Sequence, residues 1–96
     1  MAKRGELKPM DAWEHTIRDN AVAYNVVMFQ PGKSSRVYQS FDNLEMAVAY
    51  SKITLQEPNR IRSAMIYAID EGEHHALVGT MGRHDLQFKE VEAQTW

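Results

Sequence analysis

The densest group of ionisable side chains lies around Gly72, in the segment from Asp70 to His75. It holds carboxylates and two adjacent histidines, and carboxylate and imidazole groups are ligand types that divalent metals accept. The spacing argues against a metal site, because neighbouring residues of an extended chain point to opposite faces and no HExxH pattern is present. We therefore expect a solvated turn here, with no bound metal and no cofactor.

The stretch Pro31-Gly32-Lys33-Ser34 is similar to the end of a phosphate-binding loop. The motif requires glycine five residues before Gly32, where this chain has Val27. An extended run follows Ser34 in place of the helix whose N-terminus holds the phosphate in such loops. The sequence excludes a P-loop and leaves Lys33 as a turn cation, beside main-chain amides that could meet an anion.

A second set of cations points to anion binding. Arg60 and Arg62 have the spacing that places both side chains on one face of a strand. Lys33 and Arg36 join them if the two predicted hairpins pack side by side. Because guanidinium groups bind carboxylates and phosphates through paired hydrogen bonds, these four residues predict a site for a small anionic molecule such as a nucleotide. The other interpretation is a solvated edge with ion pairs to glutamates, which is common for surface arginines.

The overall charge gives no general attraction to polyanions. The 96 residues include 11 Lys and Arg against 13 Asp and Glu, a formal net charge of −2. This balance argues against a membrane surface and against a long nucleic-acid ligand, so a nucleotide would need a local patch. An outward-facing tyrosine beside the arginines would add stacking surface for a base, and the candidates are Tyr24, Tyr38 and Tyr67.

No nucleophile, base and orienting acid are spaced as catalytic motifs require. The chain has no cysteine, which excludes thiolate chemistry and disulfides and suits a reducing, cytoplasmic compartment. Hydrophobic residues make up 44% of the chain and charged residues 25%, as in ordinary folded domains. We expect a small soluble protein that is not an enzyme.

The elements that position these residues indicate one α+β domain. Residues 1–8 lack periodicity and are expected to form a flexible arm, with a single domain over residues 9–96. Apolar spacing predicts a short helix over 9–19, two hairpins with strands over 22–29, 35–41, 62–69 and 76–81, and a tail over 85–96 that fits either strand or helix. The predicted fold is a mainly antiparallel sheet of four or five strands, with a central helix packed on one face.

The central helix is predicted from Asp42 to Gln56. Asp42 and Glu45 have the spacing of a capping box, in which each side chain bonds the other residue's main-chain N–H. Pro58 ends the helix, because the residue before a proline is disfavoured in the α region.

This helix has two apolar faces. At about 100° per residue, one stripe contains Leu44, Ala47, Val48, Ser51 and Leu55, and a second contains Met46, Ala49, Tyr50 and Ile53. A helix on a sheet needs one such stripe, so the second predicts cover by another element, another chain or a ligand. Within the chain, the N-terminal helix with Trp13 is the available cover.

The sequence therefore favours a protein-binding module, of the size and kind of small accessory or phage-type inhibitor proteins. We expect it to be a homodimer, or to bind another protein, through the second stripe or an exposed sheet face. The candidate interface residues are Met46, Ala49, Tyr50, Ile53 and Trp13. The alternative is a small-ligand binder that uses the four cations named above.

Overall fold

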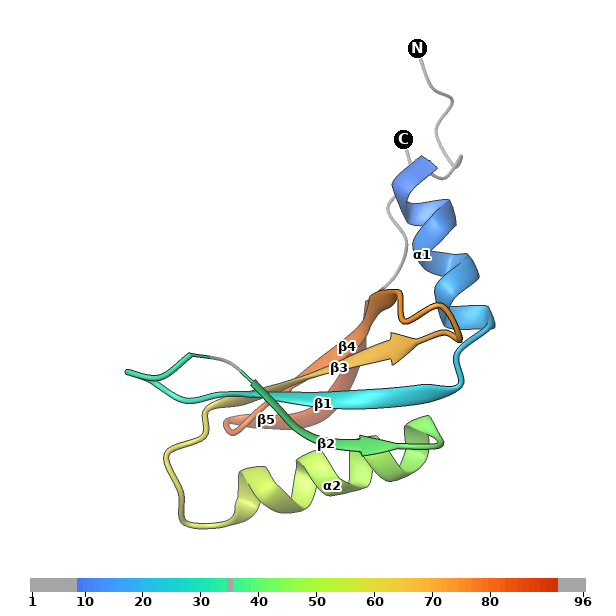
Figure 1. Ribbon diagram of the computed structural model, residues 1–96. Helices are drawn as coiled ribbons and strands as arrows, with labels where there is room; N and C mark the ends of the chain where they lie inside the picture. Colours follow the sequence, from blue (N-terminus) through green and yellow to red (C-terminus); the bar gives the residue numbers. More distant parts are fainter. Residues whose placement is uncertain (1–8, 35, 92–96) are drawn as a thin grey trace.

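The computed structural model describes residues 9–34 and 36–91. In chain order its elements are α1 (Pro9–Asp19), β1 (Ala23–Phe29), β2 (Arg36–Phe41), α2 (Leu44–Gln56), β3 (Ser63–Ile69), β4 (His75–Gly82) and β5 (Asp85–Glu90). The strands form one five-stranded antiparallel sheet in the order β2-β1-β3-β4-β5 (Figure 1). The predicted α+β fold is confirmed, whereas the predicted arm over 1–8 lies outside the described residues.

Helix α2 connects the two halves of the sheet. Since β1 is the antiparallel neighbour of both β2 and β3, the chain must cross β1 to pass from β2 to β3. Helix α2 makes this crossover beneath the sheet and packs against β1, β2 and β3 (Figure 1). The tail continues as strand β5 over residues 85–90, because Leu86 and Phe88 alternate toward the core; residues 92–96 lie outside the described part.

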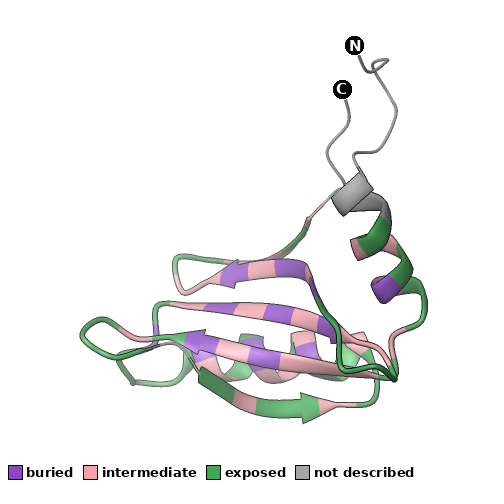
Figure 2. Cartoon of the chain, turned by 45° about the horizontal axis from the view of Figure 1, so that its top comes forward, coloured by how far each residue is buried: buried purple, intermediate pink, exposed green. Residues whose placement is uncertain are grey.

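The core lies between α2 and the sheet. Buried and half-buried residues alternate along the central strands, as Figure 2 shows. The buried cluster consists of Val26, Met28, Ala47, Leu55, Ile61, Ala64, Ile66 and Met81. The α2 stripe that was predicted to face the sheet is confirmed, and the buried Ser51 donates its hydroxyl to the carbonyl oxygen of Ala47 at 2.8 Å.

The start of α2 corrects the predicted cap. Asn43 is extended (φ −140°, ψ 158°), and its Oδ1 accepts the main-chain N–H of Met46 at 2.8 Å. The prediction of a capping box between Asp42 and Glu45 is therefore wrong by one residue, since Asp and Asn are nearly equal as caps and spacing alone does not choose between them. At the other end, Glu57 is extended before Pro58, as predicted.

A bulge on β2 changes which side chains face the core. Val26 pairs with Gln39 and Val27 pairs with Val37, so Tyr38 between them has no partner on β1. Strict alternation would place Tyr38 and Phe41 on opposite faces, yet both pack against the buried cluster. An extra residue in one strand bends it locally and re-aims the side chains next to it.

Helix α1 packs against β3 and β4 in the described part of the chain, not along α2. Its Ile17 is 1% exposed, and Arg18 donates to the carbonyl oxygen of Val91 at 2.9 Å. The prediction that the N-terminal helix covers the second stripe of the central helix within the chain is therefore wrong. Neither described helix is long and apolar enough to cross a membrane.

Candidate functional site

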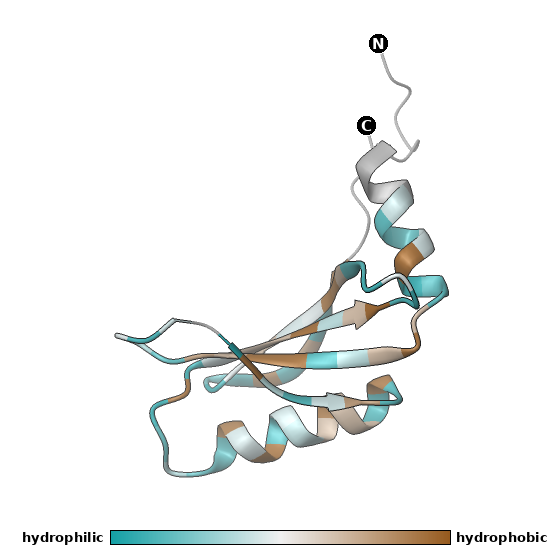
Figure 3. Ribbon diagram, in the orientation of Figure 1, coloured by the Kyte–Doolittle hydropathy of each residue, from teal (hydrophilic) through white to brown (hydrophobic). Residues whose placement is uncertain are grey.

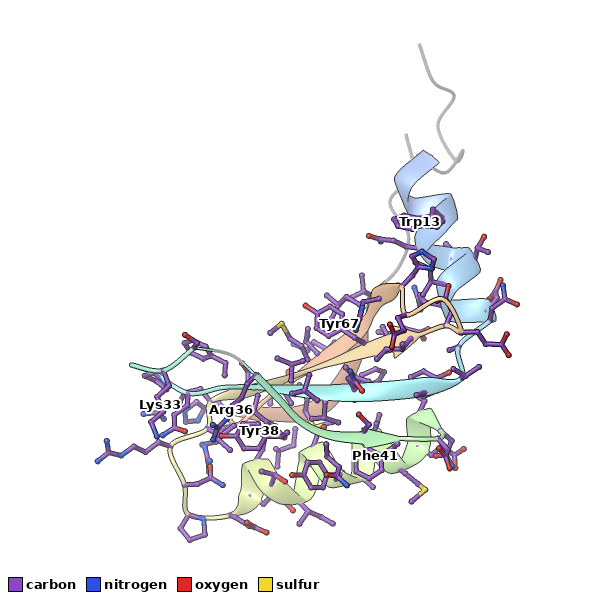
Figure 4. All side chains as sticks on the ribbon, in the orientation of Figure 1. Trp13, Lys33, Arg36, Tyr38, Phe41 and Tyr67 are labelled. Atoms are coloured by element: carbon purple, nitrogen blue, oxygen red, sulfur yellow. The ribbon has the colours of Figure 1, made fainter. Side chains whose placement is uncertain are left out.

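The sheet face opposite α2 is apolar at its centre. Val26, Met28, Ala64 and Ile66 point toward α2, so the residues that alternate with them point away. Figure 4 shows Tyr67 on this far side of the sheet, whereas Tyr38 and Phe41 lie on the side of α2. We call this surface the open face; its apolar members are Ala23, Val27, Phe29, Val37, Met65, Tyr67, Ile69 and Leu77.

The open face is partly exposed and uncharged on its three central strands. Phe29 is 41% exposed and Val37 52% exposed, and the other apolar members are half-buried. Among the described positions of β1, β3 and β4 on this face there is no Lys, Arg, Asp or Glu; the polar members are Asn25, Ser63, His75 and Thr80. An antiparallel sheet with one face in water normally carries polar side chains on that face. This apolar face is instead typical of a sheet that packs against another element or another chain.

The sequence pattern of β1 and β3 explains why both sheet faces are apolar. Both strands are hydrophobic over most of their length, as Figure 3 shows. Such two-sided strands are typical of a sheet covered on both faces. Helix α2 supplies cover on one face. A hollow between α1 and the start of α2, with a volume of about 190 Å³ and lined by residues that include Arg18, Tyr24 and Leu44, places α1 on that same side.

The second stripe of α2 is also exposed. We call it the outer stripe, and it consists of Met46, Ala49, Tyr50 and Ile53. Met46 is 53% and Ile53 58% exposed, while Tyr50 is half-buried with its ring centroid 5.3 Å from that of Phe41. The structure does not bring Trp13 to this stripe, because Trp13 lies on α1 with its ring 5.4 Å from that of His74.

Two of the predicted anion-binding residues share a hollow. Lys33 and Arg36 line a depression of about 230 Å³ together with Met28, Gln30, Ser34 and Tyr38. The guanidinium carbon of Arg36 lies 5.3 Å from the ring centroid of Tyr38, a cation–π arrangement. The main-chain N–H of Lys33 donates to the carbonyl oxygen of Gln30 at 3.1 Å, so this one amide of the turn is not free for an anion.

Arg60 and Arg62 lie at the same end of the sheet but do not line this hollow. Both are exposed in the loop between α2 and β3. The main chain of Arg62 joins this loop to the sheet: its N–H donates to the carbonyl oxygen of Phe29, and its own carbonyl accepts from Arg83, each at 2.9 Å. The four predicted cations thus share one end of the molecule, and Lys33 and Arg36 form the compact pair.

Arg83 orders this end of the molecule, and the sequence did not indicate it. Its Nε donates to the carbonyl oxygen of Ile61 at 2.7 Å, and Nη1 donates to that of Glu57 at 2.9 Å. Nη2 bonds the side chain of Asn59. These partners are 22 to 26 positions away in the chain, so no local pattern could have identified the contact.

The turn from Asp70 to His74 satisfies its own polar groups. Asp70 Oδ1 accepts the main-chain N–H of His74 at 2.9 Å, and Oδ2 lies 3.1 Å from Nδ1 of the same histidine. The bond from the main chain of His74, followed by the contacts of its ring, lowers the pKa of Asp70. No described group of three or more His, Cys, Asp or Glu side chains is placed to hold a metal ion.

No family model, curated protein or solved structure matches this chain. Among the described residues, the open face and the hollow beside Arg36 are the two surfaces from which we argue a function. The first is a broad apolar surface and the second a small cationic one, so they suit different kinds of partner.

Proposed function

We propose that this protein is a non-enzymatic protein-binding module that forms a homodimer by packing the open faces of two copies together. The observation that supports this proposal is the apolar centre of the open face on β1, β3 and β4. Burial of apolar surface contributes about 25 cal/mol per Å², so such a face can supply association energy when a second copy covers it.

The apolar part of the open face has the size of the centre of a dimer interface. The sheet has five strands, and β1 and β3 each have seven residues. At about 4.8 Å between strands and about 3.3 Å per residue, the whole sheet face has a footprint of about 550 Å², of which the three central strands account for about 330 Å². A standard interface buries roughly 800 Å² per partner, so the edge strands β2 and β5 would have to form its more polar rim.

A second copy of the chain suits this face because its centre is uncharged. A two-fold axis packs the same patch against itself, so charges of one sign would meet and repel. The nearest charged side chain by register is Lys89, which pairs with Thr80 of the open face. Its ammonium lies 2.7 Å from a carboxylate oxygen of Asp85, so the pair is neutral overall.

The outer stripe of α2 is the smaller alternative. It spans two helical turns, and of its four residues one is alanine and one, Tyr50, is already half-buried. The open face carries apolar side chains from neighbouring strands and so forms a broader surface. In a dimer built on the open face, the outer stripe remains in solvent, where it could receive a different protein.

Molecular mass in solution tests the proposal. We expect the native chain to sediment at twice the mass of one chain, and Met65→Lys to sediment as a folded monomer, because it places a charge at the centre of the interface. Val27→Lys should behave in the same way. Ile53→Lys, on the outer stripe, is the matched control and should stay dimeric.

Two results would overturn the proposal. A native chain that stays monomeric at its highest soluble concentration removes the homodimer. A dimer that dissociates on Ile53→Lys and persists in Met65→Lys places the interface on α2 and removes the open face from it. Circular dichroism of each variant verifies that the fold is retained.

A further inference from the structure

The sheet topology gathers positive charge at one end of the molecule. The β1–β2 turn, the α2–β3 loop and the β4–β5 turn all lie at this end, because neighbouring strands alternate in direction. We call it the basic end, and its cations are Lys33, Arg36, Arg60, Arg62 and Arg83. At the opposite end the β2–α2 and β3–β4 connections carry Asp42, Asp70, Glu71 and Glu73. A chain with a formal net charge of −2 thus has a locally positive end.

The hollow at the basic end has a mixed lining without acids. Among the described residues that line it, Lys33 and Arg36 supply positive charge, Ser34 and Gln30 supply neutral hydrogen-bonding groups, and the buried Met28 supplies an apolar wall. Figure 4 shows Lys33, Arg36 and Tyr38 gathered beside the turn that follows β1. The site therefore offers two cations to a ligand and no carboxylate to compete for them.

The Arg36 side chain contacts an aromatic ring that is itself anchored on the core. Its guanidinium lies against the ring of Tyr38, and Tyr38 in turn packs on the buried cluster. In the first part of the turn, Gly32 has a φ of +81° and the main-chain N–H of Lys33 donates to the carbonyl oxygen of Gln30. Glycine readily adopts a positive φ, and this conformation fixes the direction of the main chain at Lys33. An ordered cation loses less entropy on binding than a freely rotating one.

The charge and the size of the hollow indicate the class of ligand. A phosphoryl group carries close to two negative charges at neutral pH and three acceptor oxygens, which matches one guanidinium fork and one ammonium. The volume of about 230 Å³ is below the range of about 300 to 1,000 Å³ for sites that enclose a drug-sized molecule. A phosphoryl group with an attached sugar fits this volume, and any base would extend toward solvent.

We propose that this hollow binds a small phosphorylated molecule, with the phosphoryl group between Lys33 and Arg36. The site is distinct from the homodimer interface, because Arg36 pairs with Met28 on the side of α2 and stays accessible when the open faces pack together. Arg60 and Arg62 raise the local positive potential without contacting the ligand.

Ligand titration followed by amide NMR of the full chain tests this site. The probes are inorganic phosphate, ribose 5-phosphate and AMP, with adenosine as the uncharged control. We expect saturable shifts of Gln30, Lys33, Ser34, Arg36 and Tyr38 with ribose 5-phosphate and AMP, weaker binding of inorganic phosphate, and none with adenosine. Loss of one charge-assisted hydrogen bond weakens binding about tenfold or more, which we expect for Lys33→Ala and for Arg36→Ala.

Two further variants separate a built site from diffuse attraction. Lys52→Ala removes an exposed cation on α2 outside the hollow and should leave the affinity unchanged. Arg36→Lys keeps the charge but loses the guanidinium fork, so it should weaken binding nearly as much as Arg36→Ala. Retained affinity in Arg36→Lys, equal binding of adenosine, or binding of single-stranded RNA without binding of AMP would each overturn the proposal. We expect Arg36→Ala to sediment as a dimer. Loss of ligand binding in this variant would then leave the homodimer proposal unaffected.

Discussion

Val27 of β1 lies directly opposite Met65 of β3 in the antiparallel register, on the side of the sheet that faces away from α2. Met65 in turn pairs with Thr80 of β4, so the row is uncharged across the three central strands. If two copies meet on this row, their attraction comes from apolar burial and not from ion pairs. The two sources of attraction respond differently to salt, and this difference can be measured.

The dimer should be insensitive to salt. Between about 0.1 M and about 1 M salt the screening length falls from about 10 Å to about 3 Å, which weakens attraction between exposed charges. Apolar burial is not screened, so we expect the dissociation constant from sedimentation equilibrium to rise less than about twofold. A rise of tenfold or more would indicate that the basic end of one copy binds the acidic end of another.

The sequence predicted the elements better than their tertiary contacts. The β-branched runs around Gly32 and Gly72 predicted the hairpins because period-two patterns and turn residues are local signals. The contacts of Arg83 with the α2–β3 loop join residues far apart in the chain, and no local pattern encodes them. Likewise, the pattern of α2 predicted cover for its second stripe, but it did not indicate that α1 packs against β3 and β4 and leaves that stripe exposed.

The candidate site was predicted only in part, for the same reason. Lys33 and Arg36 are close in sequence and share the hollow, whereas Arg60 and Arg62 reach the same end through the crossover of α2. An exposed sheet face was among the predicted binding surfaces, but none of its residues was identified. Its extent depends on the pairing register with β3 and β4, which the sequence did not reveal.

The N-cap of α2 predicts different stability losses for substitutions at two neighbouring residues. Because the side chain of Asn43 accepts the N–H of Met46, Asn43→Ala should destabilise the fold by about 1 kcal/mol. Asp42→Ala, one position earlier, should cost less than about 0.5 kcal/mol, as exposed surface changes usually do. Urea unfolding of both variants measures the difference. A larger loss of unfolding free energy for Asp42→Ala than for Asn43→Ala would show that Asp42 is the cap, as the capping-box spacing predicted.

Gly79 should tolerate no side chain. A Cβ atom there would lie 2.7 Å from the carbonyl oxygen of Lys89 and would overlap the ring of Phe88, which packs on the core. Since overpacking costs about 1 to 3 kcal/mol, we expect Gly79→Ala to lower the free energy of unfolding by that amount. Gly82→Ala on the same strand is the control, because the nearest atoms lie 4.0 Å from its Cβ position. Equal losses in the two variants would show that Phe88 does not pack on Gly79.

The turn between β3 and β4 should make stability depend on pH through Asp70. Its pKa is lowered in the folded chain, first by the main-chain N–H of His74 and then by the His74 ring. A carboxyl with a lowered folded pKa stabilises the fold above its unfolded pKa, about 3.9, and this contribution is lost as pH falls through the folded value. We therefore expect Asp70→Asn to be less stable than the native chain near neutral pH, with a difference that shrinks as pH falls below about 4. Urea unfolding across this range measures the difference, with Glu71→Gln as the control for losing a charge in the same turn. A stability difference that stays constant down to low pH would show that Asp70 stabilises the fold through its hydrogen bonds and not through its negative charge.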